Sequence, residues 1–287
     1  MKKTLPILLL LCLALPLTGQ SCLPGGITFT DQAEIDNFQT NYPGCQVIEG
    51  DVIVASGNFS NLQGLSAVRK IAGGLRIEFN PSITSLHGLH LMDTIGGEFM
   101  VLGIGIVNFL EMQQLRHIGG LNIVNNTELT SLAGLGGIEV IPGDLNIGDY
   151  TKLTNLSGLD NLRSIGGTIS IATQNDTLMQ DLTGLGNLET IGGDLNISSN
   201  NHLSTLNGLN RLRSVGGLII QANSALSNLS GLDSLVVVEN DCFIRSNSAL
   251  IDLAGLQQLN SVGGTFDLSD NAALVNCLGL EGLQSVG

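Results

Sequence analysis

Apolar positions recur along almost the whole chain with a spacing of 23 to 26 residues. Each repeat reads I-x-G-x-L-x-I and then N-x-x-L-x-x-L-x-G-L-x-x-L, with mostly Gly, Asn, Ser, Thr or Asp between the apolar residues. Such a period is typical of solenoids, in which each turn buries its apolar face against its neighbours. The pattern predicts an all-β, leucine-rich-repeat-like solenoid of about ten turns. The first Ile or Val of each repeat, here called the anchor, is Ile48, Ile71, Ile95, Ile118, Ile141, Ile165, Ile191, Val215, Val238, Val262 or Val286.

The repeat that begins at Ile191 shows how one turn is expected to form. Leu195 and Ile197 alternate with polar residues, which indicates a short strand with one buried face. The later leucines come at every third position and favour short extended segments joined by corners. The turn around Met112 lacks a corner glycine, so we expect it to be distorted. Glycine, which tolerates a positive φ and close backbone approach, fills that corner in nine turns: Gly64, Gly88, Gly134, Gly158, Gly184, Gly208, Gly231, Gly255 and Gly279.

Stacking of turns about 4.8 Å apart places equivalent residues in columns. One column consists of asparagines, whose amides carry both a donor and an acceptor and can pair with backbone groups of adjacent turns. We expect a structural role for it, with an amide-lined ligand site as the alternative. Its members are Asn80, Asn126, Asn175, Asn200, Asn223, Asn247 and Asn271.

A second column lies two residues before each anchor and alternates in charge over seven turns. Opposite charges in neighbouring turns attract, and a slip of one turn would oppose like charges, so the column predicts register control. A charged ligand-binding stripe is the alternative reading. This charge ladder consists of Arg69, Asp93, Arg116, Glu139, Arg163, Glu189 and Arg213.

The chain divides into three segments: residues 1–19 are expected to be an export signal, 20–47 an N-terminal cap and 48–287 the solenoid. Lys2 and Lys3 precede an apolar run that is shorter than the about 20 residues of a membrane span. We therefore expect a secreted or cell-surface protein without a membrane span, and lipidation of Cys22 is an alternative. The sequence stops in mid-repeat, which suggests a truncated product and end-to-end contact through its C-terminus.

Composition and motifs exclude several classes of function. The formal net charge of −14 opposes binding to nucleic acid, which needs clustered Lys and Arg. No catalytic, phosphate-binding or EF-hand motif is present, so we expect neither an enzyme nor a cofactor or metal. Calcium at the loop column of Asp144, Asp194 and Asp241 is a minor alternative.

The segment CLPGGITFTDQAEIDNFQTNYPGCQVIEGDVIV, from Cys22 to Val54, begins the regular part of the chain. Asp31 and Glu34 fit a capping box, and a short capping helix should follow with one apolar face. The segment resembles the start of the receptor L domain of the insulin and epidermal growth factor receptors, and the downstream repeat is also similar to that family. The resemblance implies a right-handed β-helix, a Cys22–Cys45 disulfide that closes the cap, and no enzyme. Because the kinase, the cysteine-rich region and the membrane span of the receptors are missing, it does not imply growth-factor binding.

Two further features concern individual side chains. Cys242 and Cys277 replace inward apolar residues and should be buried thiols, with a bridge between them as the alternative. Phe243 and the apolar run from Val101 to Val107 are expected to make the outward face unusually hydrophobic, so we take Val101 and Phe243 as interface candidates.

These observations favour an extracellular recognition or adhesion module that binds a protein or a glycan through variable outward residues on a constant scaffold. The alternatives are a purely structural or ice-binding rod and, as a further option, a β-helix enzyme acting on polysaccharide. The mixed residues at the position of Asn196 argue against an ice template, and the absence of Trp argues against a sugar enzyme.

Overall fold

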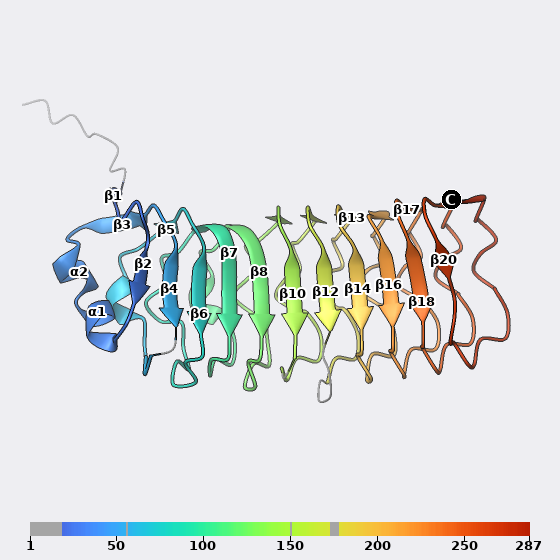
Figure 1. Cartoon of the computed structure of the whole chain (residues 1–287), viewed down its shortest axis with the longest axis horizontal. Helices are drawn as coiled ribbons and strands as arrows, with labels where there is room; N and C mark the ends of the chain where they lie inside the picture. Colours follow the sequence, from blue (N-terminus) through green and yellow to red (C-terminus); the bar gives the residue numbers. More distant parts are fainter. Residues whose placement is uncertain (1–18, 56, 150, 173–177) are drawn as a thin grey trace, which may run out of the picture.

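The computed structural model describes residues 19–55, 57–149, 151–172 and 178–287. They form a parallel β-solenoid of leucine-rich repeats, with long strands side by side along the axis of the molecule (Figure 1). This confirms the predicted fold class. The long strands, here called the long ladder, are β2 (Ile27–Phe29), β4 (Val52–Ala55), β6 (Leu75–Glu78), β7 (Thr94–Leu102), β8 (His117–Val124), β10 (Leu145–Gly148), β12 (Ile169–Ala172), β14 (Leu195–Ser198), β16 (Leu218–Gln221), β18 (Cys242–Arg245) and β20 (Phe266–Asp267).

Most turns also contribute a second, shorter strand, which from β3 onward ends on the anchor residue. In the N-terminal turns these strands are β1 (Gln20–Cys22), β3 (Cys45–Ile48) and β5 (Lys70–Ile71), which pair on to β7. In the later turns they form a separate seven-stranded sheet, here called the short ladder. It contains β9 (Val140–Ile141), β11 (Ser164–Ile165), β13 (Thr190–Ile191), β15 (Ser214–Val215), β17 (Val237–Val238), β19 (Ser261–Val262) and β21 (Ser285–Val286).

The strands β7 and β8 differ from the others because each runs without interruption from the anchor to the end of the long strand. Their register shifts once, between Ile95 and Glu98, where the chain carries a pair of glycines. Elsewhere the same corner separates a short strand from a long one. The short strands β1, β3 and β5 and the long strands therefore join in one sheet at β7, whereas the short ladder remains a separate sheet.

The interior holds one continuous apolar core because strand residues alternate between inside and outside. Leu195 and Ile197 are both fully buried, and Asn196 between them is half-buried. Eight of the nine corner glycines have φ between 109° and 118°. In the turn of Gly64 the corner is instead a 3-10 helix (Gln63–Leu65), and a Cβ on Gly64 would collide with the carbonyl of Ile35. The turn of Met112, which lacks the glycine, also forms a 3-10 helix (Leu110–Met112).

The N-terminal cap consists of two short helices, α1 (Gln32–Asp36) and α2 (Phe38–Asn41), rather than one. The carboxylate of Asp31 accepts a hydrogen bond from the backbone of Glu34, and Glu34 in turn accepts one from Thr30. Ile35 and Phe38 are fully buried, so the helices cover the end of the core.

Two expectations about side-chain placement are wrong. Val101 is fully buried, because it continues the inward alternation of Phe99 and takes the position that Ile197 has in its own turn. Cys277 is exposed although it has the repeat position of Leu253, which is fully buried. In the part of the chain that the structure describes, no helix is both long and apolar enough to cross a membrane.

Candidate functional site

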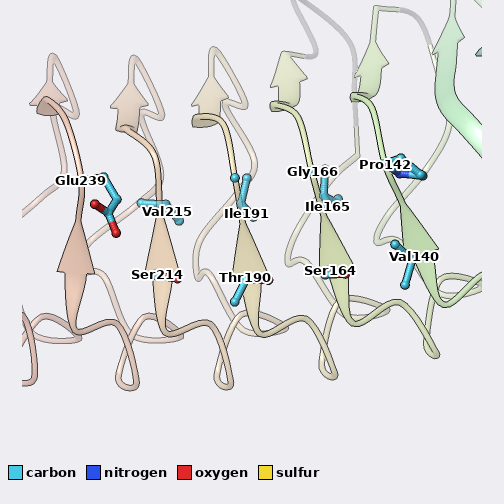
Figure 2. Close-up of a pocket in the computed structure, with 11 residues that line it drawn as sticks. Val140, Pro142, Ser164, Ile165, Gly166, Thr190, Ile191, Ser214, Val215 and Glu239 are labelled. Carbon is cyan, nitrogen blue, oxygen red and sulfur yellow. The ribbon is translucent and has the colours of Figure 1, made fainter.

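The short ladder carries a shallow depression of about 520 Å³, here called the trough. It is lined by Val140, Pro142, Ser164, Ile165, Gly166, Thr190, Ile191, Gly192, Ser214, Val215 and Glu239. These residues come from five consecutive turns, so at about 4.8 Å per strand the trough is about 19 Å long. Figure 2 shows Pro142 toward one end and Glu239 toward the other, with Ser164, Thr190 and Ser214 between them.

Glycines keep the floor of the trough free of side chains. A Cβ on Gly166 would collide with the carbonyl of Pro142, and one on Gly192 would collide with the carbonyl of Gly166. Close stacking of the backbone therefore requires glycine at these positions. Because glycine has no side chain, the surface is low along the middle of the short ladder.

The first residue of each short strand points outward and supplies the polar groups of the trough. Ser164, Thr190 and Ser214 are paired in register through β11, β13 and β15. None of their three hydroxyls has a hydrogen-bond partner among the described residues. A hydroxyl can both donate and accept, so this row can bind polar groups of an extended ligand. The sequence signal for this row of hydroxyls is a Ser or Thr one residue before the anchor, which the repeat pattern of apolar residues does not reveal.

The charge ladder runs along one side of the trough, one residue before the outward hydroxyls. The backbone stacks as expected, since the amide of Arg163 donates to the carbonyl of Glu139 and the amide of Glu189 to that of Arg163, both at 2.8 Å. Of the neighbouring charged pairs, however, only Arg163 and Glu139 approach each other within 4.0 Å in the described part of the chain.

The other members of the charge ladder are placed differently. Arg116 donates to the carbonyls of Gln113 and Leu115. Arg69 and Asp93 border another depression, and Glu189 and Arg213 border a smaller one. A continuous ladder of ion pairs is therefore not formed, because long exposed side chains gain little from pairing in water.

The asparagine column lies inside the solenoid. Asn80, Asn126, Asn200, Asn223, Asn247 and Asn271 are buried, and Asn175 lies outside the described residues. In the best-formed stretch, Asn223 donates to the carbonyl of Ile197 at 2.9 Å and accepts from the backbone of Asn200 at 3.0 Å. Buried amides of this kind bond the backbone of preceding turns and have no surface to offer a ligand.

The loop acids also bind the backbone. Asp144 accepts from the amide of Thr168, and Asp241 from that of Thr265, each at 2.7 Å. Asp194 lies close to Gly217 in the next turn. Across the described residues, no group of three or more His, Cys, Asp or Glu side chains could hold a metal ion.

Phe243 lies on the outward face of the long ladder and is half-buried. The guanidinium of Arg245 lies 3.9 Å from the centroid of its ring and also contacts the carboxylate of Asp267 at 2.9 Å. Hydrogen bonds from Ser269, and then the charge of Arg245, hold the pKa of Asp267 below its usual range. Of the two interface candidates, only Phe243 is therefore at the surface, and Arg245 already covers one face of its ring.

Comparisons with known proteins add little to this description. No protein-family model matches the chain, and no curated protein matches its sequence. A crystal structure of a TLR13–ssRNA13 complex is similar over 91 % of this chain and 46 % of that chain, with 15 % sequence identity and a TM-score of 0.38. The chain thus spans about half the length of that protein, and a likeness at this level carries no functional argument.

Proposed function

We propose that this chain is a secreted or cell-surface recognition module without catalytic activity, which binds a protein or a glycan through the trough. The observation that carries the proposal is the row of unpaired hydroxyls on a floor of glycine backbone. A trough about 19 Å long matches an extended polymer better than a compact small molecule, since about six residues of extended peptide span that length.

Three other features support the proposal. The inward positions repeat almost unchanged while the outward positions vary from turn to turn, which is how a scaffold presents a selective surface. The Cys22–Cys45 disulfide fits an oxidising compartment. The resemblance of the first repeats to the receptor L domain favours binding over catalysis, and the net charge of −14 favours partners other than nucleic acid.

Arrays of immobilised glycans and extracellular proteins, probed with the purified chain, would test the proposal. Ser214→Tyr places a ring in the trough, and we expect it to reduce binding of the retained ligand at least tenfold. Ser261→Tyr is the matched control, because Ser261 has the same place in β19 but does not line the trough. Equal effects of the two substitutions, or no retained ligand on either array, would contradict the proposal and favour a purely structural rod.

A further inference from the structure

The most unusual surface side chain of the molecule is Phe79, in the corner that follows the long strand β6. This corner has a positive φ in most turns, and its other described members with a positive φ are Gly103, Asn125, Ser199, Ala222, Ser246 and Asp270. Phe79 has φ +54° and is 56 % exposed. A bulky apolar residue there buries less than half of its surface and adds backbone strain. Folding alone therefore gives no reason for a phenylalanine there.

The ring of Phe79 borders a second hollow, separate from the trough and next to the N-terminal cap. This hollow has a volume of about 710 Å³ and is lined by Thr30, Asp31, Gln32, Gly57, Asn58 and Phe79. On the side of the following turn the ring approaches Gly103, where an added Cβ would lie 3.4 Å from its edge. The ring is thus held between that glycine and the hollow.

The polar side chains around the hollow are only partly used by the fold. The hydroxyl of Thr30 and the amide of Asn58 make no hydrogen bond with any described residue. One carboxylate oxygen of Asp31 accepts from the amide of Glu34 at 3.0 Å, and the other oxygen has no hydrogen-bond partner in the described part of the chain. Gln32 fixes the wall, since its side-chain oxygen accepts from the amide of Ser60 at 2.9 Å.

From this arrangement we infer that the hollow beside Phe79 binds a single pyranose. The apolar C–H face of a pyranose stacks on an aromatic ring, while its hydroxyls need both acceptors and donors. Asp31 supplies the acceptor, Asn58 supplies a donor and an acceptor, and Thr30 supplies a further hydroxyl. A volume of about 710 Å³ lies within the usual range for small-ligand sites. This inference does not rest on the trough, which lies on the short ladder.

Saturation-transfer NMR on the purified chain would test the inference with four separate probes: the methyl glycosides of glucose, galactose, mannose and N-acetylglucosamine. We expect at least one to bind, and we expect Phe79→Asn to weaken that binding roughly tenfold, because the stacking surface is lost. Asparagine tolerates a positive φ, so this variant should melt at the same or a higher temperature. Loss of binding would then not reflect unfolding.

Two further variants complete the test. Phe79→Tyr keeps the ring and should retain binding, and Ser214→Tyr, which alters only the trough, should leave the signal unchanged. The inference is overturned if none of the four glycosides shows transfer. It is equally overturned if Phe79→Asn binds the glycoside as tightly as the unchanged chain does, whatever the melting temperature of the variant.

Discussion

At the scale of single residues, the buried asparagines illustrate why polar side chains persist inside an apolar solenoid. Each corner of the coil leaves backbone groups that no strand neighbour reaches, and a buried unpaired group costs about 1–3 kcal/mol. The side chain of Asn247 donates to the carbonyl of Ile220 and accepts from the amide of Asn223. One amide therefore satisfies two backbone groups of the preceding turn, which no apolar residue could do.

Replacing Asn223 by alanine should lower the free energy of unfolding by about 2–5 kcal/mol, because the carbonyl of Ile197 and the amide of Asn200 would both lose their partner. Urea denaturation monitored by circular dichroism would measure the change. Asn240 is exposed, and Asn240→Ala should alter stability by less than about 0.5 kcal/mol. Similar losses for both variants would contradict the structural role of the column.

The two free thiols among the described residues, Cys242 and Cys277, should react very differently. Burial raises the pKa of Cys242 from 9.0 to about 12, so its thiolate is scarce at pH 8, whereas Cys277 is exposed. Of these two thiols, iodoacetamide at pH 8 should modify only Cys277 in the native chain and both in denaturant, as read by peptide mass spectrometry. Because the folded pKa is raised, the contribution of Cys242 to stability is complete below pH 9 and is lost as the pH rises toward 12. Rapid native labelling of Cys242 would refute its burial.

At the scale of elements, the disulfide joins the first strand to the cap that covers the core. It closes a loop between residues 23 apart and links β1 to β3. Removing it as Cys22→Ser with Cys45→Ser should cost about 3 kcal/mol through the greater entropy of the unfolded chain. Hydrogen exchange should rise in β1 to β4 and in α1 and α2, while Cys277→Ser changes nothing there. Faster exchange spread evenly over all turns would show that the cap is not a local unit.

The charge ladder should contribute little to stability, as expected for exposed charged side chains. Arg163 and Glu139 are 62 % and 68 % exposed and lie at the limit of pairing distance. Glu139→Gln should change the free energy of unfolding by less than about 1 kcal/mol. Addition of 1 M salt should change the free energy of unfolding by the same amount in the unchanged chain and in the variant. A larger loss that salt abolishes would show that the ladder stabilises the fold.

At the scale of the whole molecule, the sequence predicted the architecture because the repeat specifies inward positions directly. Leu195, Ile197 and Leu203 are buried as their spacing requires. What the repeat could not specify are features that depend on neighbours in space. The 3-10 corner at Gly64 depends on the cap that packs against it. The trough depends on glycines that stack on one another in neighbouring turns. Phe79 was missed because only its backbone conformation makes its exposure unusual.

The uninterrupted strands β7 and β8, each of which takes the place of a short and a long strand, have a mechanical consequence. A solenoid pulled at its two ends should unravel turn by turn from the C-terminus, since each turn contacts only its neighbours. A later turn shares six paired residues with the next turn, two in the short strands and four in the long strands, whereas β7 and β8 pair at seven positions along one uninterrupted strand. In an optical trap, the force trace should therefore show its highest plateau when unravelling reaches residue 124, because the pairs of one uninterrupted strand must yield together, and even plateaus throughout would contradict this. If the chain is tethered at a surface, β7 and β8 set the load beyond which the N-terminal turns are released.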